Sequence, residues 1–339
     1  LMRGSVRWLS GVFIACFIVS QSGFAQSYVD DVVVRLDPAL DEIIDPNAKL
    51  EILKEDYFGA TEGPVWVEDD AEGYLLFSDQ AANRIYKWTP DGTFSIFLEP
   101  SGFTGNLREL DLNGSVYNLG RLYVSLLGSN GLALDREGRL LMCTHGDRAL
   151  VRLEEDGTRT VLADQFEGKR LNGPNDLAVR SDGSIYFTDL GVLAGKELPP
   201  SVYRWKDGVL QLLASNVQGG SANGIALSPE EKYLYVAASR KVVRYRVLPD
   251  GSITDEEVFV DMSGATERGG PDGIKVDQRG NVWFGGPGGL WVVSPVGTRL
   301  GLIRNERNIN LAFGDADGKG LYITTFTGLV RIRLNSSAR

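Results

Sequence analysis

The chain has 339 residues, of which 43% are hydrophobic and 24% charged, as in a soluble globular protein with a sizeable core. Its formal net charge of −10 at pH 7 argues against a nucleic-acid-binding protein, which needs a basic surface, and against binding to an anionic membrane. Forty-one glycines indicate many tight turns between short elements.

Residues 1–25 have the pattern of an export signal. Arg3 and Arg7 precede an apolar run from Leu9 to Val19, and Gly23-Phe24-Ala25 offers small residues at a cleavage position. The apolar run is shorter than the roughly 20 residues that a membrane-spanning helix needs. We therefore expect a cleaved signal peptide and a mature protein without a membrane segment, either periplasmic or secreted. An uncleaved anchor is the alternative.

After a loose lead-in at residues 26–47, short apolar strands recur along the chain. Each copy follows a turn residue, which is Gly in five of the six cases. These turn residues lie 38 to 49 residues apart, except for a first interval of 65. Apart from that interval, the spacing is close to the roughly 40–50-residue repeat of propeller blades. The six copies are residues 74–77, 140–143, 185–188, 233–236, 282–285 and 321–324.

A second apolar strand follows each copy, and several of these second strands end at an Asp-Gly hairpin turn. Six antiparallel units of about four strands predict an all-β fold, a six-bladed β-propeller over residues 48–335. A pair of β-sandwiches is the alternative. The last unit ends after three strands, so we expect Leu50–Leu53 to supply its outer strand and close the ring. The long first interval predicts an insertion near residues 101–128, as a loop or hairpin.

One amide or carboxylate side chain stands at a similar position in each unit, just before an apolar strand. Because the first strand of each blade lines the central channel, we expect these side chains to point at the axis from one end. Taken singly, each could instead be a turn former. A ring of oxygen ligands suits a hard cation such as Ca²⁺, whereas a zinc site prefers His and Cys. The six residues are Glu62, Asn130, Asn175, Asn223, Asp272 and Asn310.

Four segments in order along the chain resemble the signature of the SMP-30/gluconolactonase family, and two more resemble its bacterial gluconolactonase-like branch. The resemblance extends over about residues 50–334, with no blade missing. The four segments are Glu62-Gly63-Pro64-Val65-Trp66, Asn175-Asp176, Asn223-Gly224-Ile225 and Pro271-Asp272-Gly273-Ile274. The two further segments are Ser129-Asn130-Gly131-Leu132 and Thr144-His145-Gly146-Asp147.

The resemblance implies one divalent metal held by Glu62, Asn175, Asn223 and Asp272. We expect Ca²⁺, with Mg²⁺, Mn²⁺ or Zn²⁺ as alternatives. The resemblance also implies a metal-dependent hydrolase of small cyclic esters, with a sugar lactone as the expected substrate. The metal would polarise the carbonyl group, and Asp272 would be the catalytic residue, as a base or a water-positioning group.

Asn130 and His145 fall in the second unit, beside the gap in the metal quartet, and are the candidates for substrate binding. The single histidine of the chain could also act as a proton shuttle or be purely structural. Catalysis by a Ser-His-Asp triad is disfavoured, because no Gly-x-Ser-x-Gly elbow occurs.

Two other functions stay open at the level of sequence. One is a non-catalytic propeller that binds a ligand or a protein and holds a structural metal. The other is an esterase or phosphotriesterase of the same fold. The polar axial ring favours a hydrolase over the non-catalytic propeller, because a purely structural channel could be closed with apolar side chains. We expect the protein to be a monomer or a weak homodimer.

Overall fold

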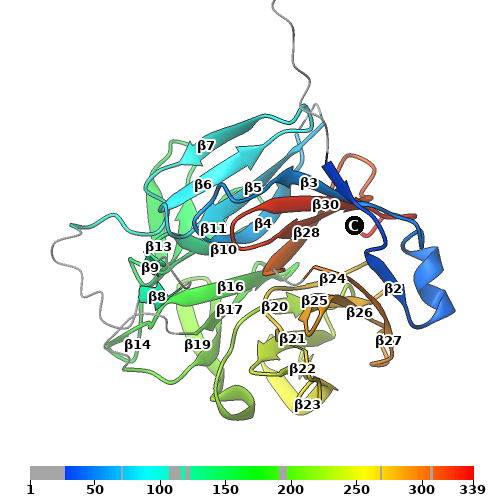
Figure 1. Ribbon diagram of the computed structural model, residues 1–339. Helices are drawn as coiled ribbons and strands as arrows, with labels where there is room; N and C mark the ends of the chain where they lie inside the picture. Colours follow the sequence, from blue (N-terminus) through cyan, green and yellow to red (C-terminus); the bar gives the residue numbers. More distant parts are fainter. Residues whose placement is uncertain are drawn as a thin grey trace, which may run out of the picture.

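The structure is a computed structural model that describes residues 27–69, 72–106, 116–118, 123–190, 197–267, 269–305 and 308–339. Six antiparallel sheets of four or five strands are arranged around a common centre (Figure 1). In each sheet one edge strand lies innermost, and neighbouring innermost strands contact one another all the way around. The predicted six-bladed β-propeller is therefore confirmed.

Blades 1 to 4 each consist of four strands in chain order. Blade 1 has β4 (Thr61–Val67), β5 (Tyr74–Asp79), β6 (Arg84–Trp88) and β7 (Phe94–Leu98). Blade 2 has β10 (Ser129–Leu134), β11 (Leu140–Thr144), β12 (Ala149–Leu153) and β13 (Arg159–Ala163). Blade 3 has β16 (Pro174–Val179), β17 (Ile185–Asp189), β18 (Ser201–Lys206) and β19 (Val209–Ser215). Blade 4 has β20 (Ile225–Leu227), β21 (Tyr233–Ala238), β22 (Lys241–Val247) and β23 (Ile253–Asp261).

Blades 5 and 6 each gain strands from the N-terminal segment. Blade 5 has β24 (Ile274–Val276), β25 (Val282–Gly286), β26 (Gly289–Val293) and β27 (Arg299–Ile303), with β2 (Val33–Arg35) outermost. Blade 6 has β28 (Asn310–Gly314), β29 (Gly320–Thr324), β30 (Leu329–Arg333) and β3 (Leu50–Lys54), with β1 (Ser27–Val29) outermost. The remaining elements are the pairs β8 (Val116–Asn118) with β9 (Tyr123–Ser125) and β14 (Gln165–Phe166) with β15 (Lys169–Arg170), and the 3-10 helices η1 (Pro38–Glu42) and η3 (Val217–Gly219).

The ring closes as the sequence predicted, through the segment that begins at Leu50. β3 pairs antiparallel with β30, and Ile52 lies opposite Val330. The buried carboxylate of Glu51 accepts a 2.7 Å hydrogen bond from the Arg331 guanidinium. The first and last parts of the chain thus share one blade, which ties the two ends of the ring together.

The lead-in was expected to be loose, but its described part is packed against the ring. β2 pairs with β27, and β1 pairs with β3. Leu40 and Ile44 are fully buried in the same hydrophobic cluster as Leu50. These side chains cover the outer edges of blades 5 and 6, so the N-terminal segment is part of the propeller's core.

Truncating Leu50 should therefore weaken the ring closure. Leu50 is 5% exposed and lies in the cluster shared by blades 5 and 6. We expect Leu50→Ala to lower the free energy of unfolding by about 2–4 kcal/mol, measured by urea denaturation. Ile96→Ala, on the outermost strand of blade 1 and 49% exposed, is the matched control and should change it by less than about 0.5 kcal/mol. Equal effects in the two variants would contradict the assigned role of β3.

Two predicted segments lie wholly or partly outside the described residues. The export signal at residues 1–25 is one of them. The expected insertion near residues 101–128 is described in part, and this part contains the antiparallel pair β8 with β9 and the buried Leu126 and Leu127. Over the ranges that the structure describes, no helix has the length and apolar character to cross a membrane.

Candidate active site

A cavity of about 180 Å³ lies at one end of the central channel. It is lined by all six side chains that the sequence analysis assigned to metal or substrate binding, and these come from five separate blades. They are Glu62, Asn130, His145, Asn175, Asn223 and Asp272. The rest of the lining is Thr61, Gln80 and the apolar residues Ala60, Leu126, Leu190, Ile309 and Phe326.

Irregular pairing at the start of the innermost strands accompanies the ring residues. In blade 1 the register between the first two strands shifts between Glu62 and Val65. Blades 2 and 3 show the same shift at the positions of Asn130 and Asn175. Such bulges bend a strand and re-aim a side chain, and they are common beside active sites.

Glycines that follow the ring residues allow neighbouring blades to approach closely. A Cβ on Gly63 would lie 2.1 Å from the carbonyl oxygen of Asn130, and a Cβ on Gly224 would lie 2.1 Å from that of Asp272. No side chain fits at such distances. At these two places the backbone of one blade therefore rests on the start of the next, which helps to set the spacing of the ring. A Cβ on Gly131 would likewise lie 2.7 Å from the Cα of Asp176, whereas one on Gly273 would lie 2.1 Å from the side chain of Asn310.

The sixth ring residue, Asn310, does not line the cavity and instead supports the residues that do. Its Nδ2 donates to Glu62 Oε2 at 3.0 Å and to Asp176 Oδ2 at 3.4 Å. Lys275 Nζ lies 3.7 Å from the same oxygen of Asp176. Asp176 is 1% exposed and stands where four other blades have a glycine. A buried polar layer thus lies beneath the cavity, and sequence reasoning had not assigned Asp176 a role in it.

In the described part of the chain, too few positively charged groups lie near the carboxylates of the site to balance their negative charge. Desolvation by burial raises the pKa of Glu62 well above its usual value, and repulsion from Asp272 and Asp176 adds to this. Desolvation in the channel and repulsion from Asp176 raise the pKa of Asp272 to about 7, although the Asn223 side chain opposes the shift. Such a site favours any ligand that brings positive charge.

The donor set fits a hard cation. Two carboxylates and two amides offer oxygen ligands, which Ca²⁺ accepts readily. Among the described residues, no group of three or more His, Cys, Asp or Glu side chains is placed to hold one metal ion. A metal in this cavity would consequently depend on the amide oxygens of Asn175 and Asn223 as well as on Glu62 and Asp272. This set is unlike the nitrogen and sulfur ligands of zinc sites.

His145 is fully buried and contacts Asn130. Burial lowers the pKa of His145 to about 4, an effect that the backbone of Leu126 partly offsets. Its Nε2 lies 3.2 Å from Nδ2 of Asn130. With Nδ2 of Asn130 as the donor, Nε2 is the acceptor and the ring proton is assigned to Nδ1. A ring that stays neutral near pH 7 and is engaged in this way fits a positioning role better than that of a proton shuttle.

A second set of equivalent positions in the blades also contributes to the cavity, and this set was not recognised in the sequence. Gln80, His145 and Leu190 each directly follow the second strand of their blade, after β5, β11 and β17. All three line the cavity. Aligning the blades at this position, as was done for the ring residues, would have identified Gln80 together with His145.

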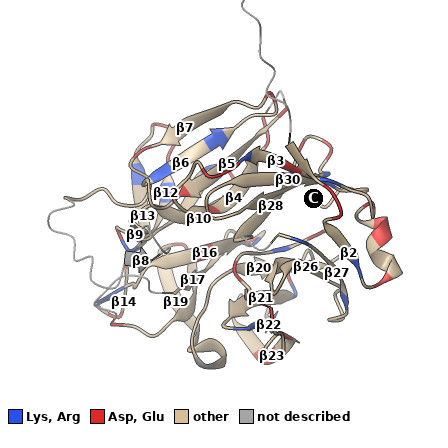
Figure 2. Ribbon diagram, viewed as in Figure 1, with Lys and Arg blue, Asp and Glu red and all other residues tan. Residues whose placement is uncertain are grey.

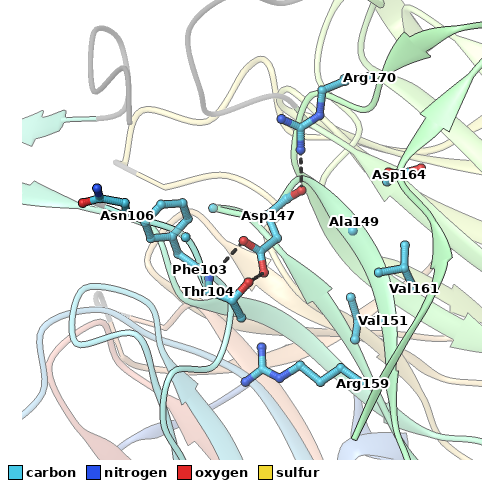
Figure 3. A pocket seen from close by; sticks show the side chains of 12 residues that line it. Phe103, Thr104, Asn106, Asp147, Ala149, Val151, Arg159, Val161, Asp164 and Arg170 are labelled. Carbon is cyan, nitrogen blue, oxygen red and sulfur yellow. Dashed lines mark hydrogen bonds between the residues drawn. The ribbon is translucent and has the colours of Figure 1, made fainter. Parts of the chain in front are cut away.

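A larger groove on blade 2 lies outside the channel and is not the predicted site. It measures about 580 Å³, and none of the six predicted residues lines it (Figure 3). The Asp147 carboxylate accepts hydrogen bonds from the backbone and hydroxyl of Thr104, and Arg170 donates to the Asp147 carbonyl. Acidic and basic residues are interspersed around the ring (Figure 2).

Residues 60–327 match the family model described as the SMP-30/gluconolactonase/LRE-like region. The chain is 33% identical over 330 residues to a gluconolactonase of Zymomonas mobilis, with 89% of this chain and 85% of that protein covered. The solved structure of a gluconolactonase from Xanthomonas campestris has a TM-score of 0.74 at 31% identity, covering 92% of this chain and 99% of that one. Regucalcin from Agrobacterium tumefaciens, a calcium-binding protein, shares the fold, with a TM-score of 0.64 at 18% identity over 85% of this chain and 96% of that one.

Proposed function

The chain belongs to the SMP-30/gluconolactonase/LRE-like family, and on this premise we propose that it is a metal-dependent lactonase that hydrolyses a sugar lactone. The proposal is carried by one observation. Glu62, Asn175, Asn223 and Asp272 converge from four blades on a cavity of about 180 Å³. The two carboxylates among them have raised pKa values there, and a cation would relieve their repulsion.

Glu62, Asn175, Asn223 and Asp272 would hold the ion, which we propose to be Ca²⁺. When bound, it would polarise the lactone carbonyl and stabilise the negative charge that develops on its oxygen. Amide and carboxylate oxygens suit this ion, and flexible coordination would leave room for the substrate. The relatives that are named gluconolactonases support the lactone as substrate.

Asp272 orients the attacking water and accepts its proton. The water oxygen bonds to the carbonyl carbon, the ring C–O bond breaks, and the proton passes to the leaving oxygen to give a hydroxy acid. Asp272 is partly exposed to the cavity, so a water molecule can reach it. Asn130, held by His145, binds the substrate. Phe326, Leu126 and Leu190 limit the access of bulk water.

A lactone assay with and without a chelator tests this proposal. Proton release from a panel of aldonolactones is measured for the purified protein, then after treatment with EDTA, and then with Ca²⁺ or Mg²⁺ restored. We expect chelation to lower the rate at least about 100-fold, because the carbonyl loses its electrostatic stabilisation, and Ca²⁺ to restore it.

Thermal unfolding of the same samples serves as the control. A protein that Ca²⁺ stabilises against unfolding but that hydrolyses no lactone would contradict the proposed lactonase and support the non-catalytic alternative. Hydrolysis that is unaffected by EDTA would contradict the metal dependence. Export to the periplasm or beyond stays a prediction, since residues 1–25 lie outside the described part of the chain.

A further inference from the structure

Gln80 occupies a position in the cavity wall that none of its contacts explains. It directly follows β5, at the position in blade 1 that is equivalent to that of His145 in blade 2. It lines the cavity with Glu62 and Asp272. Its backbone is fixed, because its N–H donates to the Ala60 carbonyl and its own carbonyl accepts from Gly128 at 2.8 Å. The side chain is thus held at the site on a rigid part of the blade.

The amide of Gln80 has an unsatisfied oxygen. Gln80 is 4% exposed, and among the described residues its Oε1 has no hydrogen-bond partner. Asn130, which is 2% exposed and lines the same cavity, has an Oδ1 in the same condition. Most buried polar groups in proteins have a partner, so two unsatisfied acceptors around one small cavity point to a ligand that supplies donors.

The chemistry of the cavity defines that ligand further. Glu62 and Asp272 disfavour an anion, while two amide oxygens call for hydroxyl or similar donors. A volume of about 180 Å³ is smaller than the roughly 300–1,000 Å³ of sites for drug-sized ligands. The organic occupant is therefore small, not anionic and rich in hydroxyl groups.

We propose that Gln80 is a substrate-binding residue whose amide oxygen accepts a hydrogen bond from a ring hydroxyl of the lactone. With Asn130, it makes the site selective for polyhydroxylated lactones over aliphatic lactones of the same ring size. This inference rests on the proposed lactonase function. It adds a specificity residue outside the metal-binding quartet and identifies the group of the substrate that this residue recognises.

Gln80→Leu tests the proposal with two probes, glucono-1,5-lactone and δ-valerolactone, which share a six-membered ring but differ in hydroxyl groups. We expect kcat/KM for glucono-1,5-lactone to fall about 10- to 100-fold, mainly through a higher KM. For δ-valerolactone it should stay within about threefold of the wild type. Gln80→Met, which retains an unbranched side chain, should show the same selectivity change if the leucine variant folds poorly.

Gln211→Leu, at an exposed position of β19, is the matched control and should leave both rates unchanged. An equal fall on both lactones in the Gln80 variants, or no change on either, would overturn the role of Gln80. A wild-type protein that hydrolyses neither lactone would instead contradict the proposed function. The proposed selectivity for polyhydroxylated lactones would then be contradicted as well. The comparison between variants tests the role of Gln80, whereas the activity of the wild type tests the proposed function, so the two failures can be distinguished.

Discussion

Replacing Asp272 by Asn is expected to lower kcat for lactone hydrolysis by about 100- to 10,000-fold, the usual contribution of a positioned general base. The amide keeps the size of the side chain and one oxygen for a metal, but it cannot take a proton from water. The pKa of Asp272, raised to about 7 by desolvation and by Asp176, is matched to proton transfer near neutral pH. A bound cation would lower this pKa and make Asp272 a weaker base. The loss of kcat in Asp272→Asn therefore measures proton acceptance, and the rate that remains reflects positioning of the water.

Two further variants complete the test of Asp272. Asp272→Ala removes the ligand oxygen as well, so it should lose both turnover and stabilisation by Ca²⁺ while staying folded. Asp255→Asn, on β23 and exposed, is the matched control and should retain wild-type kinetics. Initial rates on glucono-1,5-lactone and thermal unfolding with and without Ca²⁺ provide the two readouts. Turnover close to the wild type in Asp272→Ala, on every lactone tested, would exclude this residue from the chemistry.

Adding one methyl group at Gly224 is expected to lower the free energy of unfolding by about 3–5 kcal/mol, a large effect for so small a change. The new Cβ would lie 2.1 Å from the carbonyl oxygen of Asp272 and 2.8 Å from the amide nitrogen of Ile274. Both are backbone atoms of the next blade, so a side-chain rotation cannot relieve the clash. The innermost strands of blades 4 and 5 would have to separate, and Asp272 would move with them.

Gly264→Ala is the control for this prediction. No atom lies within 4 Å of a Cβ added there, and the residue has no positive φ. Urea denaturation should place this variant within about 1 kcal/mol of the wild type. A Gly224→Ala protein as stable as the wild type would show that blades 4 and 5 can shift apart at little cost, against the tight ring described above.

The blade repeat was predictable because the second strand of a blade is buried on both faces. β11 and β17, for example, are buried along their whole length between neighbouring blades. They therefore read as continuous apolar runs, which recur clearly in the sequence. The strands β1 and β2 were not predicted. Each is only three residues long and exposed or half-buried, which is too short for the sequence to show the alternation of a strand.

The ring residues were predictable for a similar reason, since each precedes an apolar strand at nearly constant spacing. Asp176 lies in a signature segment but was given no role, because Asn175 beside it occupies the ring position. Its packing against Gly131 and its contact with Asn310 place it beneath the cavity. Gln80 follows a strand rather than preceding one, and such a position becomes part of the cavity wall only when the blades pack together. Asn310 has the sequence pattern of a ligand, yet its amide donates to Glu62 beneath the cavity.

The pairing of β3 with β30 also limits the order in which the molecule can form. Glu51 and Arg331 meet across this pair although they are 280 residues apart in the chain. A growing polypeptide cannot make this contact until all six blades, through β30, have been synthesised. Until then β3 has no partner on that side, and the free edge is open to pairing with other chains. The pairing of β3 with β30 is thus a late and slow step of folding, as expected for contacts between residues so far apart in the sequence.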